Sequence, residues 1–210
     1  MILKNFAVFE GGDGSGTTTQ LELVRNRFIQ SSPPVFPPLY TTCEPTDGPI
    51  GRLLRSALRG EITLQAETLA TLFAADRNEH VYAPGGIEER SKRGELVLSD
   101  RYVLSSLVYQ GIDCGEALPR RLNSRFPLPE LLLFFDIESG LAISRMQGRQ
   151  IREIYEYPRF QRKVRERYQA LLPWYAREGV RVEIIDASQS PQAVAEEVWR
   201  ALTQMPILKG

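Results

Sequence analysis

The sequence lacks an excess of charge of either sign, because its 210 residues contain 26 Lys and Arg against 26 Asp and Glu. A protein that holds nucleic acid or an anionic membrane by general electrostatics needs a positive excess. We therefore expect no nucleic acid and no membrane as partner, and any anion must bind at a local site. Cysteine is scarce as well, since only Cys43 and Cys114 occur, far apart and without metal-ligand or C-x-x-C spacing. This argues against a zinc site or a disulfide scaffold and predicts two reduced, buried thiols.

Long hydrophobic runs are also absent. No stretch reaches the roughly 18 apolar residues of a membrane span, and the apolar residues 6–9 are bounded by Asn5 and Glu10, unlike a signal peptide. We therefore expect a cytoplasmic protein. Apolar residues (42%) and charged residues (25%) are near globular averages, so intrinsic disorder is not expected. The length suits one domain over residues 1–210.

Short apolar runs alternate with longer amphipathic segments, which predicts an α/β fold of repeated βα units around a mainly parallel sheet. The predicted strands are residues 5–10, 39–44, 95–100, 130–137 and 181–186. The predicted helices are residues 16–30, 63–90 with a break at Pro84-Gly85-Gly86, 102–110, 158–177 and 191–203. Residues 31–38, with four prolines, and residues 147–158 are predicted loops.

Residues 145–167 carry a local positive excess, with eight Lys or Arg against three Glu. One interpretation is a solvated helix face with i,i+4 ion pairs, such as Arg162 with Glu166. The other is a cover that closes over a polyphosphate.

A glycine-rich segment follows the first predicted strand and precedes a helix. In such a loop, backbone N–H groups and the helix dipole both favour a phosphate anion. The spacing G-x-x-x-x-G, one residue, then Ser or Thr is that of a P-loop, although Thr17 occupies the usual lysine position. The candidate ATP-binding residues are Gly11, Gly12, Asp13, Gly14, Ser15, Gly16, Thr17 and Thr18.

The Thr18 hydroxyl is predicted to bind Mg²⁺ in this loop. Asp13 would be repelled by phosphate, so we expect it to contact a sugar hydroxyl. The alternative is a purely structural glycine turn. A dinucleotide-binding loop is disfavoured because G-x-G-x-x-G fails in every register.

The predicted strand 95–100 ends in Asp100, directly followed by Arg101. This brings charge of both signs to the carboxyl edge of the sheet, where α/β proteins bind ligands. Asp100 can hold Mg²⁺, and Arg101 can bind a phosphate in a bidentate manner. Asp136 is a rival metal ligand, and a structural ion pair between Asp100 and Arg101 is the plainer alternative.

Residues 100–110, Asp-Arg-Tyr-Val-Leu-Ser-Ser-Leu-Val-Tyr-Gln, closely resemble the signature of thymidylate kinases, which phosphorylate dTMP. The resemblance extends along nearly the whole chain: residues 6–19 are similar to the family's first strand and P-loop, 42–45 to its T-R-E-P loop, 73–77 to its F-x-x-D-R helix, and 148–168 to its lid and following helix. It implies a three-layer α/β/α P-loop NTPase fold with a five-stranded parallel sheet in the order 2-3-1-4-5. A lid at about residues 145–158, ATP with Mg²⁺, and a homodimer are also implied.

By position, the resemblance also implies the acceptor site. Phe73 would stack on thymine, Arg77 would donate to its carbonyl edge and Arg101 would hold the monophosphate. Tyr109 would crowd the sugar 2′ position, and Asp13 would accept the 3′-hydroxyl. The implied substrate-binding residues are Asp13, Glu44, Pro45, Phe73, Arg77, Arg101, Ser105, Ser106, Tyr109 and Gln110. For Phe73 and Tyr109 the alternative is ordinary packing in the core.

Two positions depart from the family pattern: Thr17 replaces the P-loop lysine and Cys43 replaces the arginine of T-R-E-P. Gly14 places the chain with members that lack a P-loop arginine and supply it from the lid. Arg149 and Arg152 are the best candidates for that role, followed by Arg145. Together with Asp100 and Arg101, Arg149 and Arg152 are therefore the candidate catalytic residues.

Phosphoryl transfer to an anionic acceptor needs positioning and charge neutralisation rather than a general base. The resulting hypothesis is a dTMP kinase whose lid arginines compensate for the missing lysine. The alternative is a catalytically impaired nucleotide-binding relative, which Thr17 would favour. A GTPase switch is disfavoured, because no asparagine is followed by lysine.

Overall fold

The computed structural model describes residues 1–30, 36–146, 154–155 and 157–209. Its strands are β1 (Ile2–Gly11), β2 (Leu39–Cys43), β3 (Leu96–Asp100), β4 (Leu128–Asp136) and β5 (Arg181–Asp186). Its helices are α1 (Thr17–Gln30), α2 (Pro49–Leu58), α3 (Ala66–Tyr82), α4 (Ile87–Lys92), α5 (Val103–Cys114), α6 (Ala117–Asn123), α7 (Ser139–Met146), α8 (Pro158–Arg177) and α9 (Pro191–Leu202), with a 3₁₀ turn at Pro206–Leu208.

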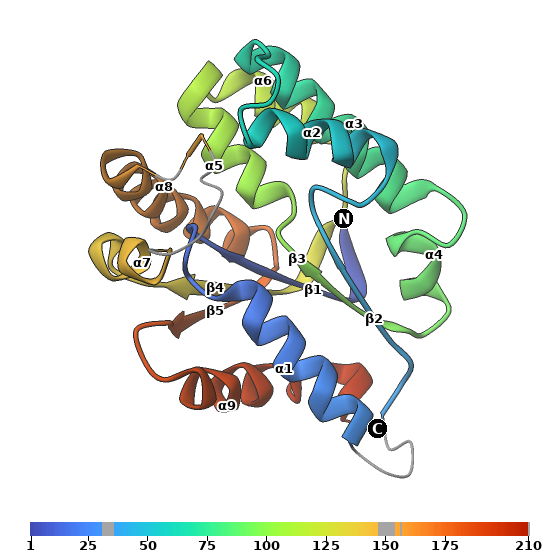
Figure 1. Cartoon of the computed structure of the whole chain (residues 1–210). Coiled ribbons are helices and arrows are strands. Elements are labelled where there is room, and N and C mark those ends of the chain that lie inside the picture. Colours follow the sequence, from blue (N-terminus) through green and yellow to red (C-terminus); the bar gives the residue numbers. More distant parts are fainter. Residues whose placement is uncertain (31–35, 147–153, 156, 210) are drawn as a thin grey trace.

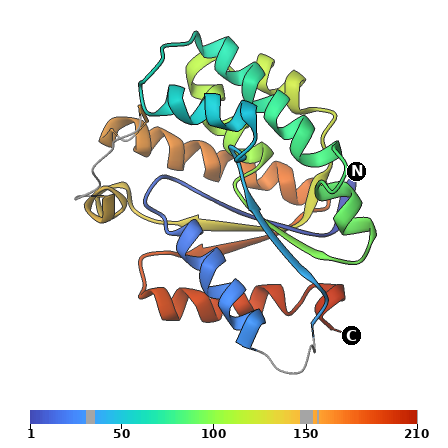
Figure 2. The same ribbon diagram turned by 45° about the vertical axis from the view of Figure 1, so that its right-hand side comes forward.

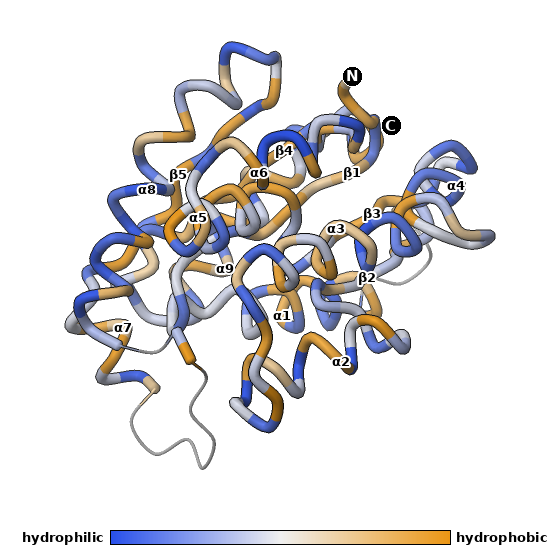
Figure 3. Tube along the Cα trace, turned by 90° about the horizontal axis from the view of Figure 1, so that it is seen from above, coloured by the Kyte–Doolittle hydropathy of each residue, from blue (hydrophilic) through white to orange (hydrophobic). Residues whose placement is uncertain are grey.

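The five strands form one parallel sheet in the order β2-β3-β1-β4-β5, as the family resemblance implied. Helices α1 and α9 cover one face, and α3, α5 and α8 cover the other (Figures 1 and 2). Because both faces are covered, the central strands are continuously apolar. In β1, Phe6 and Val8 point into one core while Ala7 and Phe9 point into the other. The hydropathy tube accordingly shows β1 and β3 as mostly hydrophobic (Figure 3).

All five predicted strands are present, with differences at their ends. The main one is β1, which begins at Ile2 rather than at residue 5, and its pairing with β4 shifts register between Leu3 and Ala7. Asn5 lies inside this irregularity with φ of 56°. Polar Asn5 therefore marks a bulge and not the start of the strand.

Among the helices, the predicted break at Pro84-Gly85-Gly86 separates α3 from α4. Helices α2, α6 and α7 were not among the predicted helices. Helix α2 starts with Pro49 at its first turn and buries Leu54, Ala57 and Leu58 at helical spacing, so a signal was present in ten residues. Helix α6 has only seven residues, too few for a periodic pattern.

Two further expectations concern the thiols and the membrane. Cys43 and Cys114 are free, as predicted, but half-buried instead of buried. Across the described ranges, no helix is both long and apolar enough to cross a membrane. The predicted loop 31–38 is described only from residue 36, and most of the predicted lid lies outside the described residues.

Candidate active site

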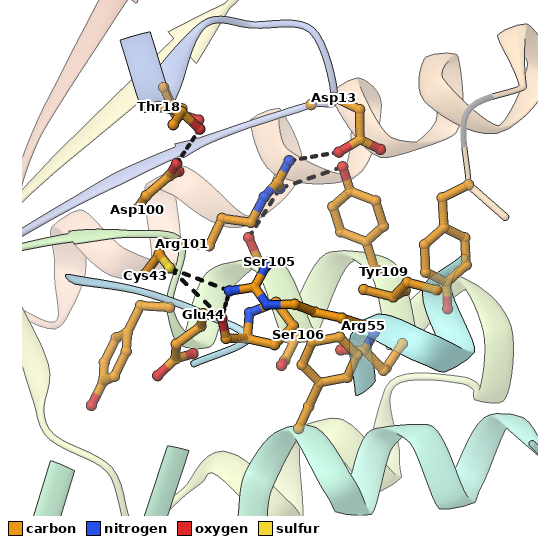
Figure 4. A pocket seen from close by; sticks show the side chains of 18 of the residues that line it. Asp13, Thr18, Cys43, Glu44, Arg55, Asp100, Arg101, Ser105, Ser106 and Tyr109 are labelled. Atoms are coloured by element: carbon orange, nitrogen blue, oxygen red, sulfur yellow. Dashed lines mark hydrogen bonds and ion pairs between the residues drawn. The ribbon is translucent and has the colours of Figure 1, made fainter. Parts of the chain in front are cut away.

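A cavity of about 360 Å³ lies at the carboxyl ends of β1, β2 and β3. It brings together the glycine loop, the turn after β2, the turn after β3, and side chains from α2, α3 and α5 (Figure 4). The predicted site residues that line it are Gly12, Asp13, Gly14, Gly16, Thr17, Thr18, Glu44, Pro45, Phe73, Arg77, Asp100, Arg101, Ser105, Ser106, Tyr109 and Gln110. Gly11 and Ser15 do not line it. Arg149 and Arg152 lie outside the described residues.

The glycine loop takes a conformation that depends on two of its glycines. Gly14 and Gly16 have φ of 83° and 90°, in the left-handed region that glycine adopts without strain. A Cβ atom on Gly14 would also lie 2.4 Å from the backbone oxygen of Ala142 in α7. The loop therefore packs closely against α7 and leads directly into α1, whose N-terminus faces the cavity at Thr17.

Asp100 and Thr18 meet at one end of the cavity. The Thr18 hydroxyl donates a 2.5 Å hydrogen bond to Asp100 Oδ2, while Oδ1 of Asp100 is buried without a partner among the described residues. A hydroxyl beside an unsatisfied carboxylate oxygen is a hard-oxygen donor set that fits Mg²⁺. The described residues contain no cluster of three or more His, Cys, Asp or Glu side chains for a metal. An ion here would thus take its other ligands from phosphates and water, as Mg²⁺ commonly does.

The rival metal ligand, Asp136, is occupied elsewhere. Arg165 holds its carboxylate with hydrogen bonds of 2.7 and 3.0 Å, and Asp136 does not line the cavity. The prediction that Asp136 competes with Asp100 for a metal is therefore not supported by this arrangement. Arg145, the third lid candidate, is also engaged elsewhere, because its guanidinium donates to the carbonyl of Ala187 at 2.7 Å.

Arg101 lies at the centre of the cavity, with its backbone at φ of 68°. A left-handed conformation in a non-glycine residue costs on the order of 1–3 kcal/mol and is concentrated at functional sites. The guanidinium donates to Asp13 Oδ1 at 2.6 Å and to the Gly11 carbonyl at 2.8 Å, and lies 5.3 Å from the centre of the Tyr109 ring. The alternative interpretation, a structural ion pair between Asp100 and Arg101, is not found among these contacts, because Arg101 pairs with Asp13.

Asp13 is held from a second side by Gln161 of α8. Gln161 Nε2 donates to Asp13 Oδ2 at 2.6 Å, and Gln161 Oε1 accepts from the Asp13 amide at 3.1 Å. Gln161 is buried and also donates to the carbonyl of Tyr155. The helix after the predicted lid is therefore tied directly to the glycine loop. No signal in the sequence identified Gln161, because 148 residues separate it from Asp13.

Arg77 forms a buried network below the cavity. Its guanidinium, 1% exposed, pairs with Glu44 at 2.6 Å and also donates to Ser106 Oγ and Asn123 Oδ1. Burial alone would raise the pKa of Glu44, but Arg77 and His80 hold that pKa below its usual value. The second hydrogen of Arg77 Nη1 has no acceptor among the described residues, which leaves one donor for a ligand.

The side of the cavity formed by α3 and α5 is lined by Phe73, Tyr109 and Gln110. Phe73 and Tyr109 also pack in or against the hydrophobic core. Each therefore both lines the cavity and packs in the core, so the two interpretations of these residues do not exclude each other. Gln110 is buried, and its Oε1 has no partner among the described residues. A ligand that donates a hydrogen bond would satisfy this oxygen.

Glu10 and Arg55 were not identified from the sequence. Glu10 follows the apolar run of β1 and is fully buried. Burial raises the pKa of its carboxyl to about 7, although the hydrogen bond from Ser105 and the charge of Arg101 lower this pKa. A carboxylate at the end of a buried strand was a usable signal. Arg55 was missed because it lies on the unpredicted helix α2.

Comparison with known proteins agrees with this geometry. A family model described as thymidylate kinase matches residues 9–198. A Treponema pallidum protein named as a thymidylate kinase is 39% identical over 99% of both chains. One so named from Pyrobaculum aerophilum is 40% identical over 92% of this chain and 93% of its own, and one from Methanococcus maripaludis strain C6 is 40% identical over 81% and 78%.

Proposed function

Because the chain belongs to the thymidylate kinase family, we infer that it transfers the γ-phosphoryl group of ATP to dTMP, giving dTDP and ADP for dTTP synthesis. The observation that carries this inference is the position of Arg101. It lies between the glycine loop and Asp100 on one side and the Phe73, Tyr109 and Gln110 side of the cavity on the other. A cation there faces both the donor and the acceptor phosphate.

We further propose the acceptor contacts. Phe73 stacks on thymine, the free Nη1 hydrogen of Arg77 donates to a base carbonyl, and Gln110 Oε1 accepts from the base N–H. Asp13, which Arg101 and Gln161 hold in place, accepts a hydrogen bond from the 3′-hydroxyl. Tyr109 fills the space that a ribose 2′-hydroxyl would need, which excludes ribonucleotides by sterics. Glu44, Pro45, Ser105 and Ser106 complete this side of the cavity.

On the donor side, the glycine-loop amides other than those of Asp13 and Ser15, which donate within the protein, bind the ATP phosphates together with the N-terminus of α1. Thr18 and Asp100 would hold Mg²⁺, which neutralises phosphate charge when bound. Arg101 brings the acceptor oxygen towards the γ-phosphorus. No side chain has to remove a proton, since the acceptor oxygen is already anionic.

The activity is tested by a coupled ADP-release assay with dTMP, dUMP, dCMP and dGMP as acceptors. We expect ADP release with dTMP above all. An impaired relative, the alternative that Thr17 favours, would bind dTMP and ATP but release no ADP. The complete set of Asp100, Arg101, Phe73 and Arg77 weighs against that alternative.

The missing P-loop lysine leads to a separate prediction. A charge-assisted hydrogen bond contributes about 1.5–3 kcal/mol, roughly 10- to 200-fold in rate. We propose that Arg149, with Arg152, supplies this charge from the lid. Arg149→Ala should then lower dTDP formation by that factor, and Thr17→Lys in the same chain should restore part of it. An unchanged rate in Arg149→Ala would remove that residue from the mechanism.

The family resemblance also supports a homodimer. Size-exclusion chromatography with light scattering tests this, with about twice the chain mass of 23.8 kDa expected. Because ATP and dTMP are the substrates, we propose a cytoplasmic location, which cell fractionation would check.

A further inference from the structure

The backbone of Arg101 is strained, and the end of β1 holds it in place. Its φ of 68° is in the left-handed region, which a non-glycine residue keeps only when the surrounding structure fixes it. The Arg101 amide donates to the carbonyl of Phe9 at 2.9 Å, and the next amide, that of Tyr102, donates to Glu10 Oε1 at 3.0 Å. Two consecutive residues of β1 therefore hold both peptide groups that flank Arg101.

The carboxyl of Glu10 also caps the helix that begins directly after this turn. Helix α5 starts at Val103, and within the described chain Tyr102 at its N-cap makes no side-chain cap hydrogen bond. Glu10 Oε1 accepts from the amide of Ser105 at 3.3 Å, in addition to that of Tyr102. The first amides of a helix need an acceptor, and an acidic group there faces the positive end of the helix dipole. Glu10 thus supplies from β1 the cap that α5 lacks.

The other carboxyl oxygen of Glu10 is connected to the guanidinium of Arg101 through two hydroxyls. Glu10 Oε2 accepts from Ser105 Oγ at 2.6 Å and from the Tyr168 hydroxyl at 3.0 Å. Arg101 Nη1 lies 3.4 Å from each of these hydroxyl oxygens, and Figure 4 shows Ser105 beside the guanidinium. Glu10 itself is fully buried and is not among the described residues that line the cavity. Its effect on a ligand must therefore pass through Arg101 and the groups around it.

We propose that Glu10 is a positioning residue for the acceptor phosphate, because it holds the backbone of Arg101 and the two hydroxyls beside its guanidinium before dTMP binds. This proposal rests on the proposed function and adds a residue to it. A guanidinium that is already aligned loses little freedom on binding phosphate, which raises the affinity without a further contact. A glutamine side chain could replace the carboxyl in this role, since its oxygen can accept from the two amides and its nitrogen can donate to the two hydroxyls.

The test compares dTMP with thymidine, which lacks the phosphate, in calorimetric titrations of the wild type and two variants at pH 7. Glu10→Met keeps the approximate volume of the side chain but none of its hydrogen bonds. We expect it to weaken dTMP binding by about tenfold, part of the value of a charge-assisted contact, and to leave thymidine binding unchanged. Glu10→Gln should recover most of the dTMP affinity that Glu10→Met loses.

A double-mutant cycle with Arg101 separates positioning from a general structural effect. Arg101→Met alone should weaken dTMP binding by roughly 10- to 150-fold. Adding Glu10→Met should then cause little further loss, because no guanidinium is left to align. If circular dichroism shows that Glu10→Met does not fold, Ser105→Ala takes its place in the titrations and in the cycle. That variant removes the hydroxyl between Glu10 and Arg101 and keeps the amides bonded to Glu10.

Glu130→Met is the matched control. The Glu130 side chain is 12% exposed and also accepts from a backbone amide, that of Asn5 at 2.8 Å. It lies near the amino end of β4, whereas the cavity is at the carboxyl ends of the strands. Glu130→Met should lower the free energy of unfolding and leave the affinities for dTMP and thymidine unchanged.

Equal dTMP affinity in the wild type and the variant tested would overturn the proposal. So would an equal loss for dTMP and thymidine, or a loss that persists in full without the Arg101 guanidinium, because either result shows a structural role only. Failure of Glu10→Gln to recover affinity would also overturn it, since the contacts would then not be what matters. A wild type that binds no dTMP would instead refute the proposed function, so the two failures are distinguishable.

Discussion

Glu10 combines complete burial with a full set of hydrogen bonds. Its Oε1 accepts from the amides of Tyr102 and Ser105, and its Oε2 accepts from the hydroxyls of Ser105 and Tyr168. Burial raises its pKa from 4.5 to about 7. The folded protein therefore holds a proton at Glu10 between these values, whereas the unfolded chain has released it.

This difference makes stability depend on pH. Uptake of a proton on folding means that the free energy of unfolding falls as the pH rises through this window, by roughly 3 kcal/mol at most. Glu10→Gln keeps the shape, and its amide can donate to the two hydroxyls, which can reverse their direction. It should match the wild type near pH 5 and be more stable by up to that amount near pH 8.

Urea unfolding at both pH values measures this effect. Glu22→Gln, an exposed change on α1, is the control and should follow the wild-type pH dependence. A stability difference between wild type and Glu10→Gln that stays constant with pH would contradict the account.

Asp100 and Asp136 allow a paired test of the metal site, because both end a strand but only Asp100 lines the cavity. Chelation of Mg²⁺ should abolish dTDP formation. Asp100→Asn should raise the Mg²⁺ concentration for half-maximal rate by about tenfold or more, the usual scale for a lost ligand or its support. Asp136→Asn should leave that concentration unchanged and lower only stability, by loss of the Arg165 pair. The reverse result would move the metal to β4.

At the scale of elements, α8 is connected to the glycine loop through one side chain. The side-chain oxygen and nitrogen of Gln161 both form hydrogen bonds with Asp13. The nitrogen also donates to the carbonyl of Tyr155, which lies near the end of the predicted lid. A shift of α8 would therefore move the carboxylate that we propose as the acceptor of the 3′-hydroxyl.

Gln161→Leu removes this connection while keeping the volume nearly constant. We expect kcat/KM for dTMP, divided by kcat/KM for 3′-deoxy-dTMP, to fall several-fold. This corresponds to the roughly 1 kcal/mol that a well-aligned hydrogen bond to the 3′-hydroxyl contributes. Steady-state kinetics with both acceptors measure it. Gln169→Leu, exposed on the same helix, is the control and should keep the wild-type ratio. Equal loss for both acceptors would mean that Gln161 has only a structural role.

At the scale of the whole molecule, the cavity joins three strands with α1, α2, α3 and α5, which lie far apart in the chain. Its lining residues run from Gly12 to Tyr155, so a ligand in it would contact segments that lie far apart in the sequence. Binding should therefore stabilise the whole fold and not one segment.

Thermal unfolding tests this coupling. At a dTMP concentration about 100 times its Kd, linkage adds about 2.7 kcal/mol, which raises Tm by roughly 5–10 °C for a chain of this size. The same concentration of dGMP should give no shift. A wild type with no shift in dTMP, or an equal shift in dGMP, would argue against the assigned base pocket.

The sequence by itself determined the strands, their βα alternation, and the residues that follow their carboxyl ends, because apolar periodicity and glycine spacing are local properties of a chain. Only the tertiary structure decided that Arg101 pairs with Asp13 and not with adjacent Asp100, that Gln161 reaches the glycine loop, and that Arg55 lies beside Cys43. The pairs with Asp13 span 88 and 148 residues. Side chains that far apart meet only where buried strands and packed helices place them, and local spacing carries no record of that packing.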